Sequence, residues 1–188
     1  MKLYIFDFDG TITRYDSFIR FTFFSLSFFK FFKYWLFVLL YLPFKSRGEL
    51  KEIFYLNFKE KDIKCFNSIC LRFLENVLSK TVKNSFLKFL KTVNENSKIV
   101  VVSASIKNYL KPWCDNMGLE LISTELEVIN GKLTGKFSTP NCNGKEKVRR
   151  IKEKYNLSEY DEIHVFGNSK GDFPMLSLGT HKYFRFFK

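Results

Sequence analysis

The chain has 188 residues, 46% of them hydrophobic, which is enough to bury one substantial core. Its formal net charge of +12 favours anionic partners, although the general abundance of lysine would produce the same charge without a specific purpose. The four cysteines lack CxxC spacing and the two histidines have no sequence neighbour at ligand spacing. These features argue against a disulfide framework or a histidine-based zinc site, and they predict a cytoplasmic protein.

The first predicted element is a strand, the apolar run from Leu3 to Phe6. A continuous apolar run is typical of a strand that is covered on both faces of a parallel sheet. Further strands are expected over residues 98–105, 162–169 and 181–187. Apolar residues at helical spacing precede two of them, over residues 84–95 and 145–157. This alternation predicts an α/β fold with a doubly wound, Rossmann-like parallel sheet.

Residues 14–80 break this alternation, because they are rich in phenylalanine and have helical spacing. We expect them to form a helical cap inserted after the first strand, with residues 1–13 and 81–188 forming the core domain. Residues 126–137 alternate around an Asn-Gly pair. This pattern predicts a β-hairpin with a type I′ turn, which extends from the sheet or acts as a flap.

The most apolar part of the predicted cap is residues 18–44. A membrane span is not expected, because Lys30 and Lys33 interrupt the segment and one crossing would divide the sheet between the two sides of the membrane. One alternative is an interfacial helix, with Tyr34, Trp35 and flanking basic residues at an anionic membrane surface. The other alternative is a cap helix whose apolar side packs onto the core.

Asp7 and Asp9 follow the first strand directly, separated by one phenylalanine. On an extended chain such residues point the same way, so both carboxylates should face one site. Their repulsion would be relieved by Mg²⁺, or by a proton on one carboxyl with a raised pKa. Gly10 would let the backbone approach a phosphate closely. Because ligands bind at the carboxyl ends of parallel strands, Ser103 and Asn168 are expected nearby.

The sequence DFDGTIT resembles motif I of the haloacid dehalogenase-like (HAD) phosphatase superfamily. The resemblance spans the chain, since VVVSAS is similar to motif II, GKEKVRRI to motif III and FGNSKGDFPML to motif IV. The large insertion after motif I resembles the phosphoserine phosphatase-like branch, subfamily IB. Its apolar stretch is similar to that of bacterial phosphatidylglycerophosphate phosphatases. The resemblance implies the HAD fold and Mg²⁺-dependent hydrolysis of a phosphomonoester.

The resemblance also implies a role for each matching residue. Asp7 would be the nucleophile that becomes an aspartyl phosphate, and Asp9 the general acid and base. Ser105 and Lys145 are less favoured alternatives to the motif II serine and the motif III lysine. The implied catalytic residues are Asp7, Asp9, Ser103 and Lys147. The implied substrate-binding residues are Gly10, Thr11, Ser103, Ala104 and Lys147. The implied Mg²⁺ ligands are Asp7, Asp9, Asn168 and Asp172.

One residue departs from the pattern, because many relatives have an aspartate where this chain has Asn168. An amide oxygen ligates Mg²⁺ without adding charge, so weaker metal binding or a larger role for Asp172 is expected. The expected substrate is a lipid phosphate such as phosphatidylglycerophosphate, with a soluble phosphoserine-like metabolite as the alternative. The alternative from another functional class is a non-catalytic, basic protein with the same fold that associates with membranes. The candidate partner is an anionic membrane surface, namely the inner face of the cytoplasmic membrane. No nucleic-acid partner is expected.

Overall fold

The computed structural model describes residues 1–94 and 96–188. Its centre is a five-stranded sheet with the strand order β3-β2-β1-β6-β7, in which every neighbouring pair is parallel. The strands are β1 (Lys2–Phe6), β2 (Lys98–Ile106), β3 (Glu120–Thr124), β6 (Glu162–Gly167) and β7 (His181–Phe184). The sheet confirms the predicted α/β fold. Only β3 lacks a counterpart in the sequence-based prediction, because it has no continuous apolar run.

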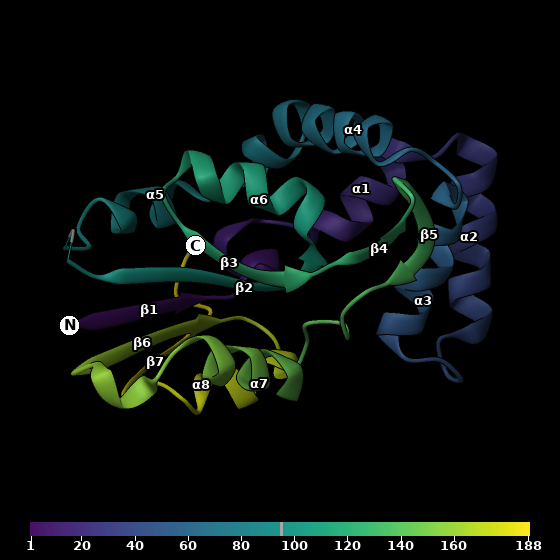
Figure 1. The fold of residues 1–188 in the computed structure, drawn as a ribbon. Helices are drawn as coiled ribbons and strands as arrows, with labels where there is room; N and C mark the ends of the chain where they lie inside the picture. Colours follow the sequence, from purple (N-terminus) through teal and green to yellow (C-terminus); the bar gives the residue numbers. More distant parts are fainter. Residues whose placement is uncertain (95) are drawn as a thin grey trace.

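Helices cover both faces of this sheet (Figure 1). Leu3 and Ile5 of β1 pack in one buried cluster with residues of α7 and α8, whereas Tyr4 and Phe6 pack in a second cluster with residues of α4, α5 and α6. The alternation of side chains along a strand therefore explains why the whole of β1 is apolar. These helices are α4 (Ile63–Asn76), α5 (Asn84–Leu90), α6 (Lys107–Asn116), α7 (Lys145–Lys154) and α8 (Phe173–Leu176). The predicted helix over 84–95 is shorter than expected, and its position 95 lies outside the described residues.

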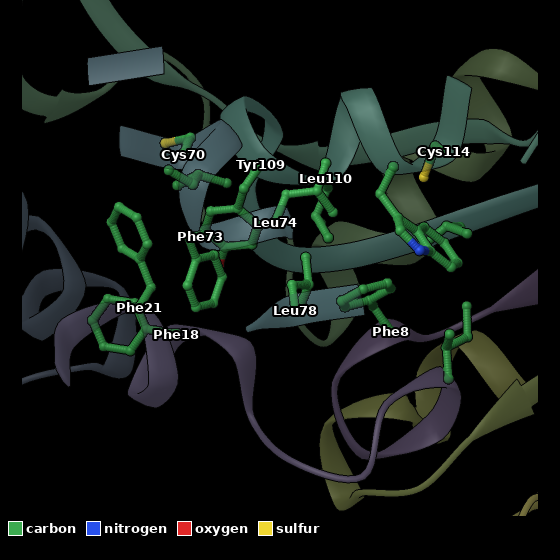
Figure 2. Close-up of a cluster of buried hydrophobic side chains, with 14 of the residues drawn as sticks. Phe8, Phe18, Phe21, Cys70, Phe73, Leu74, Leu78, Tyr109, Leu110 and Cys114 are labelled. Atoms are coloured by element: carbon green, nitrogen blue, oxygen red, sulfur yellow. The ribbon is translucent and has the colours of Figure 1, made fainter. Parts of the chain in front are cut away.

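The insertion after β1 is helical, as the sequence predicts. Its elements are α1 (Ser17–Ser25), α2 (Phe28–Tyr41), α3 (Arg47–Tyr55), a 3₁₀ turn (Leu56–Phe58), α4 and a second 3₁₀ turn (Leu78–Thr81). Aromatic side chains join α1 to the rest of the fold. Phe21 lies 5.2 Å from Phe73 of α4, edge to face, and 5.3 Å from Tyr109 of α6, measured between ring centroids. Figure 2 shows these side chains within one buried cluster. The phenylalanine-rich composition thus serves the packing of the insertion.

The predicted hairpin is confirmed as β4 (Leu126–Ile129) and β5 (Lys132–Phe137). Asn130 and Gly131 both have positive φ, at 51° and 76°, as a type I′ turn requires. The hairpin is hydrogen-bonded to the insertion, because the Glu60 amide donates to the Leu133 carbonyl at 2.8 Å and the Ile63 amide to the Gly131 carbonyl at 2.9 Å. It therefore lies against the insertion at the end of the molecule that carries α2 and α3 (Figure 1). The boundary between core and cap stays a prediction.

The helix α2 exposes most of its apolar side chains. Among the described residues, no helix is long and apolar enough to cross a membrane. Tyr34 is the one buried residue of α2, and its hydroxyl donates to the Leu50 carbonyl at 3.0 Å. The opposite side of the helix carries exposed residues that we call the α2 apolar face: Phe28, Phe29, Phe32, Leu36, Leu39 and Leu40. Packing against the core therefore explains the apolar residues on only one side of this helix.

Candidate active site

The carboxyl ends of the sheet strands open into a cavity of about 390 Å³. Most of the residues predicted for the site line it, namely Asp7, Asp9, Gly10, Ala104, Lys147, Asn168 and Asp172. Thr11 and Ser103 are buried behind this wall, and Thr11 donates its hydroxyl to the second carboxylate oxygen of Asp7 at 2.9 Å. Parallel strands and one helix thus bring together residues that are up to 165 positions apart, from Asp7 to Asp172.

Lys147 is the buried centre of the cavity wall. The Lys147 ammonium donates to Asp7 Oδ1 at 2.6 Å and to Asp172 Oδ1 at 2.8 Å. Lys147 is only 1% exposed. Burial lowers the pKa of this ammonium, but the attraction of the two carboxylates outweighs burial and raises the pKa above its usual value. Lys147 is therefore a fixed positive charge. Lys145, the alternative from the sequence, is exposed on the first turn of α7.

Asp7 is held at the end of β1 by its own backbone, whose amide donates to the Phe166 carbonyl at 2.9 Å. Its carboxyl is almost fully buried, and burial raises the pKa of that carboxyl to about 6 against the opposing attraction of Lys147. Repulsion from the Asp172 carboxylate raises it further. The site therefore holds more negative charge than Lys147 alone neutralises, and it is suited to a further cation.

Asp9 is positioned by the insertion and by β2. Its Oδ1 accepts a hydrogen bond from the Ser17 amide at 2.6 Å, and its Oδ2 accepts one from the Ser105 hydroxyl at 2.6 Å. Burial raises the pKa of the Asp9 carboxyl, and the hydrogen bonds from Ser105 and Ser17 oppose that effect. Ser105 is thus a positioning residue for Asp9, and Ser103 Oγ accepts the Ser105 amide at 3.0 Å. No motif or periodicity in the sequence pointed to Ser17.

Gly10 and Asn168 meet across the mouth of the site. Gly10 has a φ of 79°, and a Cβ placed there would lie 2.0 Å from the Asn168 side-chain nitrogen. The absence of a side chain at Gly10 therefore makes room for Asn168. Asn168 lies in the turn after β6, where its backbone amide donates to Asp172 Oδ2 at 3.1 Å.

The donors around Asp172 show how the predicted metal ligands are arranged. Asp172 Oδ2 also accepts from the amide and hydroxyl of Ser169, at 3.0 and 2.9 Å, so both carboxylate oxygens already have protein donors. The oxygens of Asp7, Asp9 and Asp172 do not gather within 4.8 Å as a set. The donor chemistry still fits Mg²⁺, because carboxylate and amide oxygens from Asp7 and Asn168 line the cavity.

The insertion contributes a group of cations that the motifs did not reveal. Arg14, Arg47 and Lys51 line the same cavity, and the Lys51 ammonium donates to the Ala104 carbonyl at 3.1 Å. Burial lowers the pKa of Lys51, with Asp9 and Asp16 opposing that effect. Arg14 directly follows motif I but is no part of it, and Arg47 and Lys51 lie more than 30 residues further on, so only the basic composition of the segment signalled them. We call these three residues the positive wall of the cavity, to whose lining the insertion also contributes Asp16.

Known proteins resemble this chain over the residues that form the sheet and the site. A model of the haloacid dehalogenase-like hydrolases matches residues 4–177. The chain belongs to this family. The recognition from motifs I to IV is therefore confirmed, and so is the expectation of an enzyme.

Relatives and solved structures resemble the chain along most of its length. Protein CicA of Caulobacter vibrioides is 27% identical over 198 residues, which cover 99% of this chain and 86% of CicA. A Bordetella pertussis protein of unknown function has a TM-score of 0.85 at 17% identity, over 95% of this chain and 87% of that one. A phosphoserine phosphatase solved as a phospho-aspartyl intermediate analogue has a TM-score of 0.67 at 16% identity, over 95% and 83%. These structures show the shared fold.

Replacing Lys147 by methionine tests the buried ion cluster. The change leaves Asp7 and Asp172 buried without their counter-charge, so we expect the free energy of unfolding to fall by about 3–5 kcal/mol. Urea denaturation at neutral pH measures the loss. The matched control is Lys145→Met on the same helix, which should change stability by less than about 0.5 kcal/mol. Equal losses for the two variants would contradict a central role for Lys147.

Proposed function

We propose that this hydrolase is a Mg²⁺-dependent phosphomonoesterase that acts through an aspartyl phosphate on Asp7. One observation carries the proposal: the buried Lys147 ammonium bridges Asp7 and Asp172 at the wall of a cavity that Asp9 also lines. A carboxylate paired with a fixed cation suits attack on a phosphate, because the cation offsets the repulsion between the two anions. The phosphoserine phosphatase solved as a phospho-aspartyl intermediate analogue supports this assignment by its shared fold.

In this mechanism Asp7 attacks phosphorus in line, and the bond to the leaving alcohol breaks. Asp9 gives its proton to the leaving oxygen and then takes one from the water that hydrolyses the aspartyl phosphate. Lys147 remains charged throughout and stabilises the negative charge that develops on the phosphoryl oxygens. Asp7 and Asn168, with Asp9 and Asp172 beside them, would hold Mg²⁺, which would supply further charge neutralisation when bound. Ser103 and the Ala104 backbone would fix the phosphate.

The substrate that we propose is a lipid phosphate with a second negative charge, such as phosphatidylglycerophosphate. The first support is the positive wall of Arg14, Arg47 and Lys51, which fits a second anionic group beside the phosphomonoester. The second is the α2 apolar face, which belongs to the same insertion. Lys33 lies at the edge of this face by helical geometry, an arrangement that suits shallow insertion into an anionic bilayer. A membrane-bound position would bring the cavity to the headgroups.

A soluble, phosphoserine-like metabolite is the second candidate substrate. It is favoured by the cavity volume of about 390 Å³, which suits a compact ligand. The same cations would bind a carboxylate as readily as a phosphodiester. Under this alternative the α2 apolar face has no part in substrate access.

Hydrolysis of p-nitrophenyl phosphate tests the enzymatic proposal against a non-catalytic protein on the same fold. We expect turnover that is lost on chelation and restored by Mg²⁺. Asp7→Asn should lower kcat by at least about 10³-fold, because the amide cannot act as the nucleophile. Asp62→Asn makes the same chemical change at the start of α4, where an amide can keep the cap, and should retain activity. Activity that survives in Asp7→Asn would contradict the mechanism.

The pH dependence follows from the buried Asp7 carboxyl. Since only its ionised form attacks phosphorus and its pKa is raised to about 6, kcat/KM should fall tenfold per pH unit below about 6 at limiting Mg²⁺. Higher Mg²⁺ favours the ionised carboxylate, so the acidic limb should then move to lower pH. Profiles measured between pH 4 and 8 at two metal concentrations check both statements. An acidic limb near pH 4 at limiting metal would show that Asp7 is not desolvated.

Co-sedimentation with vesicles separates the two substrate classes. At low salt the protein should sediment with vesicles containing phosphatidylglycerol. The double variant Phe32→Ser/Leu39→Ser should bind at least about tenfold more weakly, because it replaces two exposed apolar side chains that would be buried in the bilayer. The control is Leu71→Ser/Ile129→Ser, which removes exposed apolar residues outside α2. An unmodified protein that stays in the supernatant would leave only the soluble substrate.

A further inference from the structure

Outside the candidate active site, three potential metal ligands gather on the edge of the sheet. Glu162 and His164 lie two residues apart on β6 and therefore share one face. His181 is the direct partner of His164 in the register between β6 and β7. These are the two histidines of the chain, 17 positions apart, so sequence spacing gave no sign of a pair. The candidate active site lies beyond Gly167, at the opposite end of β6.

The ligand atoms of this group are close enough for one ion. One oxygen of Glu162 and one nitrogen of each histidine all lie within 4.8 Å of one another. The separation between His164 Nε2 and Glu162 Oε2 is 2.7 Å, and the two imidazole rings are stacked with centroids 4.5 Å apart. A proton on Nε2 accounts for the short contact when no metal is bound, and a metal ion would replace that proton.

Hydroxyl groups lie against the other nitrogen of each ring. The Tyr183 hydroxyl is 3.2 Å from His164 Nδ1, and the Thr180 hydroxyl is 3.0 Å from His181 Nδ1. When such a hydroxyl accepts the Nδ1 proton, the lone pair of Nε2 is free to bind a metal. Partners of this kind usually fix the tautomer of metal-binding histidines.

We propose that Glu162, His164 and His181 form a second metal site, for a borderline divalent ion of the Zn²⁺ class. Two imidazole nitrogens and one carboxylate oxygen suit Zn²⁺ better than Mg²⁺, and water completes the coordination. His164 is buried, whereas His181 is exposed, so the ion has access from solvent. Because the two rings are stacked in parallel, binding one ion requires the His181 ring to rotate out of the stack, and its exposure leaves room for that rotation. The bound ion ties the edge strand β7 to β6 and stabilises the folded chain.

Lys2 competes for the proposed site. Its ammonium lies 2.9 Å from Glu162 Oε2, the same oxygen that faces His164. The Lys2 side chain is 46% exposed, so it is free to move away when an ion binds. Removal of the Lys2 charge should therefore strengthen metal binding.

Titration of the full chain with ZnCl₂ in saturating Mg²⁺ tests the proposal. Calorimetry should show one bound Zn²⁺ per chain at this site, and the ring ¹⁵N signals of both histidines should shift on binding. His181→Ala should weaken binding by more than about tenfold, and Lys2→Met should strengthen it several-fold. His181 is exposed, so its replacement leaves the core intact. Circular dichroism verifies the fold of each variant.

Cys65→Ser is the control, because it removes an exposed thiol, a potential Zn²⁺ ligand that lies outside the proposed site. This variant should retain the shifts of both histidine signals. Histidine signals that do not move with Zn²⁺ would overturn the proposal. So would a His181→Ala protein that binds as tightly as the unmodified chain.

Discussion

The arrangement of this molecule depends on one buried ion cluster, in which the Lys147 ammonium lies between Asp7 and Asp172. Each partner comes from a different element: the end of β1, the first half of α7 and the turn after β6. Burying these charges is unfavourable unless all three are present together. The cluster therefore stabilises only one relative placement of strand ends and helix, and that placement also forms the cavity.

The cluster was predictable because each member lies beside a strong local pattern. Continuous apolar runs mark β1, β2 and β6 as strands covered on both faces, and the rules for parallel sheets put their carboxyl ends together. The resemblance to motif III favoured Lys147 over Lys145, and the structure buries Lys147 while Lys145 is exposed. The α/β fold follows from these patterns and the family from the resemblance of the four motifs, while the catalytic roles stay predictions.

What the sequence did not reveal depends on contacts between distant segments. Ser17 donates to Asp9 only because α1 begins against the motif I loop, and no local pattern encodes that approach. Arg47 and Lys51 reach the cavity through the packing of α3, which has no fixed spacing from any motif. His164 and His181 become neighbours through the register between β6 and β7. Periodicity identifies elements, whereas register and helix docking are set by packing along the whole chain.

The insertion is tightly packed on its inner side but leaves apolar side chains exposed on its outer side. Its inner side is a dense aromatic cluster, in which Phe21 contacts Phe54, Phe73 and Tyr109, so α1 is fixed to the core. Its outer side leaves Phe29 83% exposed on α2. Exposed apolar surface on this scale is unfavourable in water unless a partner covers it. Since α1 also holds Asp9 through Ser17, whatever covers α2 lies one helix away from the Asp9 carboxyl. The same insertion thus connects the outer surface of the molecule to the chemistry of its cavity.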